Sequence, residues 1–337
     1  MVLYSQFAKT APISKFTTSG SVLSKPVSLD FSSHRPPFRV AVTAAEPVAD
    51  RQKVKGSGQR AYRAFVGLST PLLGLLLGAT VQAQQVTPPT QPETTIAPSA
   101  QDLAKSVHNP FEDFIKVPIE SDTAFSIGPH HNTGESLNVE PLLPFRLSAE
   151  WDLIVQPNVT VTYQPSPHEA YGLEDLQTSL FLTPHGADKW LWGIGPLFQF
   201  PTATATDLGT GRWSAGPTAA FIYSRGPWFN SILAYHLMSF AGNRDRGSVN
   251  QTFIEPQLSY NFESGWYLDS NPSITFDWTA DAADGWTVPM GADVGKAFSF
   301  GSQAMSLQGG AYYFIERPSG TPQWMIRVQG TLLFPTK

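Results

Sequence analysis

The chain has 337 residues, of which 15% are charged and 12% aromatic, and its 27 Gly and 29 Pro indicate many turns. The absence of cysteine from the sequence excludes disulfide bonds and thiolate metal sites. The formal net charge of −5 is uneven, because residues 1–83 hold ten Lys and Arg and three Asp and Glu, whereas residues 84–337 hold 12 basic and 24 acidic residues. The acidic main part argues against nucleic acid as a partner, since phosphate binding needs clustered Lys and Arg.

The longest apolar run, Phe65 to Val81, has the features of an export signal. It follows two arginines and ends at a Val-Gln-Ala tripeptide that precedes Gln84. A basic stretch, an apolar stretch and a small-residue cleavage site are typical of a signal peptide, which we expect at residues 59–83. The alternative is a transmembrane helix. The shortness of the run, its Pro71 and the uncharged segment that follows disfavour that alternative.

The segments before and after this signal differ in their amino-acid composition. Residues 1–58 are rich in Ser, Thr and basic residues, which resembles an organelle transit peptide. A mistaken gene start upstream of a bacterial signal peptide is the alternative, and we favour it because the rest of the chain looks bacterial. Residues 84–98 form a Pro/Thr/Gln linker that has no means of building a core.

A short helix is expected after the linker. Ser99 opens it with Asp102 as its capping-box partner, and Pro110 ends it by about Asn109. We therefore interpret residues 99–118 as a short periplasmic helix and an entry segment.

From residue 119 onward the apolar pattern has a period of two. In the clearest segment, Trp266 to Trp278, apolar and polar side chains alternate over the whole length. Such strands are longer than the usual five or six residues and match the roughly nine to eleven that cross a bilayer. The alternative is a soluble sandwich, which would bury the apolar faces between two sheets. Strand length therefore favours an all-β fold, an up-and-down antiparallel transmembrane barrel of about twelve strands over residues 119–337. The expected strands lie near 119–127, 136–145, 150–162, 173–183, 190–201, 211–223, 227–239, 249–262, 265–278, 285–298, 304–315 and 323–334.

The connections between these strands alternate between short and long. Residues 225–227 and 263–265 are short turns, whereas 202–210 and 240–248 are longer. Short periplasmic turns and longer outer loops are the layout of outer-membrane barrels, with both termini in the periplasm when the strand number is even.

Prolines inside the expected strands do not fit a regular ladder, because proline lacks the backbone donor that a strand needs. Bulges or shortened strands would accommodate them. These prolines are Pro141, Pro157, Pro196, Pro217, Pro256, Pro272 and Pro289.

Eight of the nine tryptophans are expected at strand ends, in two rings. Two such rings are typical of the interfacial aromatic girdles of a membrane barrel. The alternative is the general preference of tryptophan for strands. Four follow short turns at intervals of 39, 38 and 38 residues, namely Trp151, Trp190, Trp228 and Trp266. Four lie beside the longer loops, namely Trp213, Trp278, Trp286 and Trp324.

The inward-facing positions of the expected strands carry more acidic than basic residues. An acidic lumen favours cations and polar solutes, whereas the alternative is a solvated interior that selects no solute. Twelve strands leave both a narrow pore and a plugged lumen open. The candidate lumen-lining residues are Glu120, Asp122, Glu140, Asp152, Asp175, Glu255, Asp269, Asp277, Asp293, Arg146, Lys296 and Arg327.

Eight segments of the chain have a characteristic sequence, namely LAKSVHNPFEDFIKVPI (103–119), LWGIGP (191–196), FPTAT (200–204), LGTGRWSAGP (208–217), VNQ (249–251), GWYL (265–268), WTVPMG (286–291) and LLFP (332–335). They resemble a family of bacterial outer-membrane proteins that is labelled transporter-like, neuromedin-U-like or linked to the meta-pathway of phenol degradation. The resemblance covers roughly residues 100–337 and carries no catalytic residues. It implies a β-barrel in the outer membrane of a Gram-negative bacterium, with an organelle outer membrane as the alternative if residues 1–58 are a transit peptide.

The same resemblance implies passive transport of small solutes, hydrophobic or aromatic compounds among them, and no cofactor. The partners expected for such a protein are the lipid bilayer with its lipopolysaccharide, the barrel-assembly machinery and the solutes themselves. A non-conducting structural or adhesion barrel is the main alternative, and an outer-membrane enzyme that acts on lipids is the third.

The sequence gives little support for catalysis or metal binding. His130, His131 and His168 lie in expected loops without spaced partner ligands, so we expect no metal site. His236 and Ser239 are three residues apart and therefore point to opposite faces of a strand, which prevents a nucleophile–base pair between them. The chain contains no G-x-S-x-G and no glycine-rich nucleotide motif.

Overall fold

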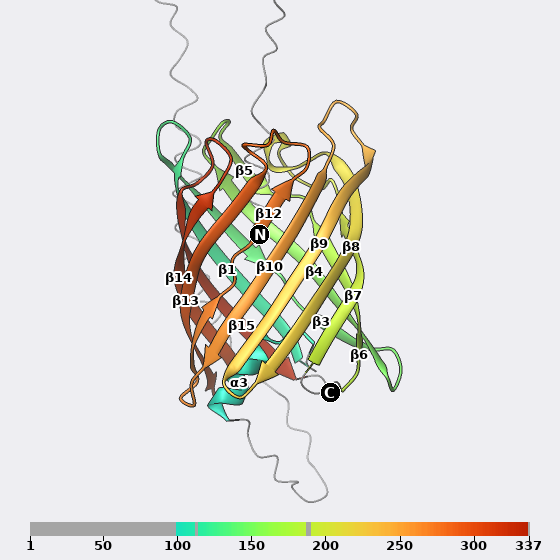
Figure 1. Ribbon diagram of the computed structural model, residues 1–337, viewed down its shortest axis with the longest axis vertical. Helices are drawn as coiled ribbons and strands as arrows, with labels where there is room; N and C mark the ends of the chain where they lie inside the picture. The colour runs from blue at the N-terminus through green and yellow to red at the C-terminus, as the bar shows by residue number, and fades with distance from the viewer. Residues whose placement is uncertain (1–98, 112–113, 187–189, 336–337) are drawn as a thin grey trace, which may run out of the picture.

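The computed structural model describes residues 99–111, 114–186 and 190–335, which form an antiparallel β-barrel with a short helix (Figure 1). The segments 1–58, 59–83 and 84–98 lie outside the described residues. In the described part of the chain, no helix has the length and apolar character that crossing a membrane requires.

Fifteen strand segments form the barrel wall, and each pairs antiparallel with its neighbours in chain order until β15 pairs with β1 and closes the cylinder. β2 and β3 share the neighbour β4, as do β5 and β6, while β11 and β12 share β10 and β13, so these three pairs are interrupted single strands. The fifteen segments are therefore twelve strands, which confirms the expected up-and-down barrel. They are β1 (Phe114–Ile127), β2 (Asn132–Val139), β3 (Leu143–Arg146), β4 (Trp151–Gln164), β5 (Ala170–Leu173), β6 (Gln177–Pro184), β7 (Trp190–Gln199), β8 (Arg212–Arg225), β9 (Trp228–Gly242), β10 (Asn250–Asn261), β11 (Trp266–Ser270), β12 (Ile274–Asp277), β13 (Trp286–Phe300), β14 (Gln303–Glu316) and β15 (Trp324–Pro335).

The two ends of the barrel differ in their connections. One end, here called the loop end, holds the long connections such as 200–211, which includes a short 3-10 helix η1 (Thr206–Leu208), and 243–249. The other, the turn end, holds tight connections such as 226–227 and 301–302. The chain enters and leaves the described barrel at the turn end (Figure 1).

The outer surface is apolar and the interior is polar. Val294 is 52% exposed, Leu258 51% and Val328 38%, although a sandwich would bury all three. Arg327 and Asp293 by contrast are at most 1% exposed and face inward. Because large apolar side chains are unfavourable in water, this outer face is suited to hydrocarbon.

Most of the in-strand prolines lie where the β-ladder is interrupted. Pro141 lies in the gap between β2 and β3, and Pro157 of β4 lies opposite that gap. Pro272 lies in the gap between β11 and β12, and Pro256 of β10 lies opposite it. Pro289 adjoins a register shift between β13 and β14. These five prolines thus lie where the ladder needs no backbone donor from them.

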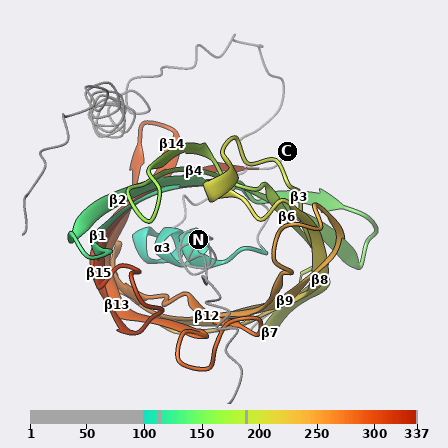
Figure 2. The same ribbon diagram turned by 90° about the horizontal axis from the view of Figure 1, so that it is seen from above.

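The expected short helix is confirmed as α3 (Ala100–His108), with Ser99 as its N-cap. The Ser99 hydroxyl accepts a hydrogen bond from the backbone N–H of Asp102. Seen along the barrel axis, α3 lies within the outline of the wall (Figure 2). β1 begins at Phe114, so residues 114–118 belong to the wall and not to an entry segment before it.

Candidate functional site: a plugged lumen

Helix α3 packs inside the turn end of the barrel through its apolar face. Leu103 and Ala104 are buried against Tyr267, Ala297 and Leu333, which face inward from β11, β13 and β15. The Tyr267 ring lies so close to Gly295 that a Cβ there would be 2.2 Å from a ring carbon, which explains the glycine. The helix is therefore held by side chains of the lumen wall and acts as a plug.

The C-terminal end of the plug is fixed by polar contacts. His108 Nδ1 lies 3.1 Å from Gln257 Nε2, and its ring packs edge-on against Tyr267 at 4.6 Å between centroids. The Lys116 ammonium donates hydrogen bonds to the carbonyl oxygens of Ser106 and Asn109, where the helix leaves its carbonyl groups unpaired. Burial lowers the pKa of His108 from its ordinary value of 6.5, with smaller effects from Asp269 (raising) and Lys116 (lowering).

Phe111 extends the plug to the opposite wall. Its ring lies 5.9 Å from that of Phe181, between centroids, and it packs with Leu142 and Ile222. A Cβ on Gly193 would lie 2.6 Å from the Phe111 ring, so glycine leaves the space that this ring fills. Leu103 and Phe111 together anchor the plug on both sides of the lumen.

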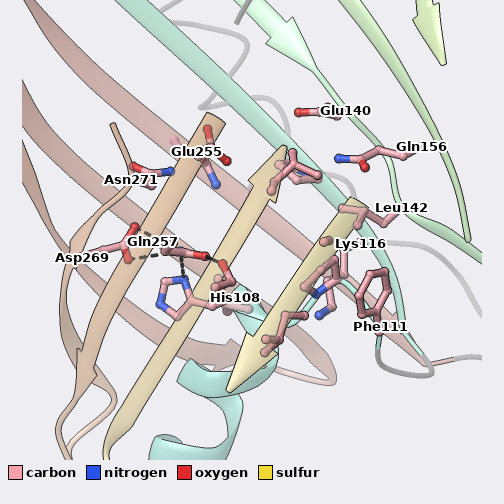
Figure 3. A pocket seen from close by; sticks show the side chains of 18 of the residues that line it. His108, Phe111, Lys116, Glu140, Leu142, Gln156, Glu255, Gln257, Asp269 and Asn271 are labelled. Carbon is pink, nitrogen blue, oxygen red and sulfur yellow. Dashed lines mark hydrogen bonds between the residues drawn. The ribbon is translucent and has the colours of Figure 1, made fainter. Parts of the chain in front are cut away.

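A cavity of about 160 Å³ lies next to the plug (Figure 3). Leu142, Phe181 and Leu233 give it an apolar side, whereas carboxyl and amide groups such as Asp269 and Gln257 give it a polar side. Figure 3 shows Glu140 and Glu255 on the side of the cavity away from His108. A second cavity, of about 60 Å³, is lined by the same two glutamates.

The largest charged group of the interior is Arg327 of β15. Its Nε atom lies 3.2 Å from a Glu120 oxygen and 3.1 Å from an Asp122 oxygen, and its guanidinium also donates to Asn271 at 3.3 Å. The guanidinium carbon lies 5.0 Å from the centre of the Tyr312 ring. These contacts tie β1, β15 and β14 to the chain between β11 and β12 across the inside of the wall.

Eleven of the twelve residues predicted to line the lumen lie in one of three places: the inside of the barrel wall, the turn end or the loop end. Seven lie inside the lumen wall, namely Glu120, Asp122, Glu140, Glu255, Asp269, Asp293 and Arg327. Asp152 and Arg146 lie at the turn end, where they form an ion pair of 2.7 Å, and His185 is also 2.7 Å from Asp152. Asp175 and Asp277 lie at the loop end.

The two carboxylates at the loop end have structural partners. Asp175 accepts hydrogen bonds from the backbone of Ala203 and Thr210, which hold the long 200–211 loop. Asp277 accepts from the backbone and hydroxyl of Thr279. Both groups order the mouth of the barrel.

Lys296 is not a lumen residue, which corrects the sequence interpretation. Its ammonium lies 5.3 Å from the centre of the Trp266 ring, and Trp266 is exposed on the outer face. Along β13 the side chains of Asp293 and Ala297 are buried while Val294 is exposed, so position 296 points outward. The inward and outward positions of β13 were assigned wrongly because its glycines and alanines do not show a clear alternation of apolar and polar side chains.

The eight tryptophans lie at strand ends on the outer face, with exposed fractions between 36% and 59%. Trp151, Trp190, Trp228 and Trp266 begin strands at the turn end. At the loop end, Trp286 and Trp324 begin strands, Trp213 is the second residue of β8, and Trp278 follows β12 directly.

Sequence reasoning missed the residues that hold the plug. His108 and Tyr267 carried no pattern of their own, and Gln257 was one polar position among many. Lys116 could have been noticed as a basic residue eight positions after the helix, where it is able to reach helix carbonyls.

The described residues contain no group of three or more His, Cys, Asp or Glu that could hold a metal ion. His236 contacts Thr252 at 2.9 Å, and the Thr252 hydroxyl also accepts from the Trp278 indole. The loop 243–249 is held against the neighbouring loop 200–211, because the Arg246 side chain donates hydrogen bonds to the carbonyl oxygens of Thr206 and Thr210.

A solved outer-membrane channel shows the same fold, and two further solved barrels are similar to a lesser degree. The COG4313 outer membrane channel from Pseudomonas putida F1 is 14% identical, with a TM-score of 0.51 over 66% of this chain and 95% of that one. The NanC porin is 8% identical, with a TM-score of 0.44 over 65% and 98%. Outer membrane phospholipase A from Escherichia coli is 12% identical, with a TM-score of 0.38 over 70% and 98%.

Neither a protein-family model nor a curated protein matches the sequence. The comparisons therefore extend to the fold and not to a family. The protein is a closed twelve-stranded barrel of the type found in the outer membranes of Gram-negative bacteria.

Proposed function

We propose that the protein is an outer-membrane channel for the passive transport of small solutes and that α3 closes its turn end. The observation that carries the proposal is a polar lumen with a cavity that ends at α3. Side-chain contacts, and no strand pairing, hold α3 in this place. A plug of nine residues can leave without breaking the wall, because every ladder of the barrel closes without it.

The orientation follows from the same features. The tryptophans at the two ends lie at the two membrane interfaces, and the Val294 face meets hydrocarbon. The turn end and α3 face the periplasm, and the loop end faces outward, toward the lipopolysaccharide. Export through a signal peptide at 59–83 and insertion by the barrel-assembly machinery complete this proposal, and the resemblance supports hydrophobic or aromatic compounds as one class of solute.

Single-channel conductance of the refolded protein in planar bilayers tests the function. The variant Leu103→Ala/Phe111→Ala removes both anchors of the plug, and we expect it to conduct more often than the wild type. The matched control Leu307→Ala/Phe221→Ala makes the same truncations on the outer face, where both side chains are exposed.

A non-conducting structural barrel is the second candidate, since α3 occupies the lumen. Absence of conductance in the wild type and in the plug variant, with both folded, would establish that candidate instead. Hydrolysis of phospholipid by the folded protein would revive the enzyme alternative.

A further inference from the structure

We propose that Glu140 and Glu255 form the selectivity constriction of the lumen and make the pathway selective for small cations. This inference rests on the proposed transport function and names its solute class. It concerns two side chains that face each other across the barrel, away from the plug.

The two glutamates come from opposite walls. Glu140 lies in the gap between β2 and β3, the second of the twelve strands, and Glu255 lies in β10, the eighth. The two strands are therefore six positions apart in either direction around the closed barrel, with five strands between them on each side, which is the largest separation possible. Strands at this separation face each other across the lumen.

Both glutamates line both cavities. The cavity beside the plug and the smaller one share Glu140, Glu255, Gln156 and Leu233. A residue that lines two neighbouring cavities lies at the junction between them. A solute that passes from one cavity to the other therefore passes between the two carboxyl groups.

The strand pairing is incomplete beside each glutamate. Pro141 follows Glu140 inside the gap between β2 and β3, and Pro256 follows Glu255 opposite the gap between β11 and β12. Neither glutamate therefore lies where its strand is paired on both sides. The same dipeptide, Glu-Pro, stands on each of the two facing walls at the junction of the two cavities.

The cations of the interior are engaged elsewhere. Lys116 is turned to the helix carbonyls, and Arg327 is paired with Glu120 and Asp122. Among the described residues, no Lys or Arg forms an ion pair with Glu140 or Glu255.

The polar neighbours of the pair are uncharged. Gln156 and Asn158 line the smaller cavity together with Glu140, and Glu255 accepts a hydrogen bond from the Ser273 hydroxyl at 3.3 Å. Two carboxylates that face each other repel, and a cation between them removes that repulsion, whereas an anion adds to it.

The test is the reversal potential of channels in a KCl gradient at pH 8. We compare the wild type with Glu140→Gln/Glu255→Gln, and we measure both also in the Leu103→Ala/Phe111→Ala background. The matched control is Glu150→Gln/Glu263→Gln, which removes two exposed carboxylates from turns at the turn end. Even in bulk water, one carboxylate 4 Å from a permeating ion changes the energy of that ion by about 1 kcal/mol. This energy corresponds to a change of about fivefold in the ratio of cations to anions at the constriction.

We expect potassium selectivity over chloride in the wild type, a fall of at least about fivefold in the Glu140/Glu255 variant, and no change in the control. Channels that conduct without cation selectivity, or whose selectivity survives the double substitution, would overturn this inference and leave the transport function standing. Absence of conductance in every background would overturn both.

Discussion

Replacing Leu103 with alanine should loosen the plug by an amount that can be worked out from its packing. Leu103 is 6% exposed and contacts the inward side chains of three strands. Truncation of a buried leucine costs about 2–5 kcal/mol, and the lower value applies here because a short helix can settle into the space. A cost of about 2 kcal/mol raises the undocked population about thirtyfold.

Hydrogen exchange of the α3 backbone amides measures this population directly. A helix of nine residues has little stability by itself, so its amides are protected only while it is docked. We expect their protection to fall about thirtyfold in Leu103→Ala and to stay unchanged in Leu307→Ala, whose side chain lies on the outer face. Equal protection of α3 in the wild type and Leu103→Ala would mean that Leu103 does not hold the helix in the lumen.

Three further changes test other parts of the structure. Val294→Arg places a charge near the middle of β13 on the outer face and should cost about 2–4 kcal/mol of unfolding free energy in lipid vesicles, measured by urea titration; an unchanged midpoint would argue against contact with hydrocarbon. Arg327→Met leaves Glu120 and Asp122 without their cation and should cost about 3–5 kcal/mol in the same assay, so a stable variant would contradict the ion-pair network. Acid should weaken plug docking, because the docked His108 has a lowered pKa while the undocked imidazole takes up a proton near 6.5. Below pH 6.5 the docking free energy should fall by up to about 1.4 kcal/mol per pH unit until the docked His108 is itself protonated, and pH-independent exchange of α3 would contradict this.

The fold could be predicted because most strands of a membrane barrel show the same alternation of apolar and polar residues. Side chains alternate between lipid and lumen, so Trp266 to Trp278 shows the period of two without any knowledge of contacts. The short helix was equally visible from the Ser99 cap and Pro110. What the pattern did not reveal is that β11 and β12 are separate, because a ladder gap depends on the pairing of the neighbouring strand.

The site was less predictable because it depends on three-dimensional contacts. The position of α3 inside the lumen follows from the pocket that Tyr267, Ala297 and Leu333 make together, and these residues are far apart in the sequence. The outward direction of Lys296 depends on the phase of β13, which Gly291 and Gly295 obscure. Only the acidic character of the interior was available from composition and alternation.

Quenching of the native tryptophan fluorescence by brominated lipids tests most directly whether the apolar outer face meets the bilayer. The protein is refolded into vesicles whose acyl chains carry bromine at successive depths. With eight tryptophans exposed at strand ends, the account predicts strong quenching that is greatest for bromine close to the headgroups. Fluorescence that no brominated lipid quenches, from a folded protein that is soluble without detergent or lipid, would contradict it.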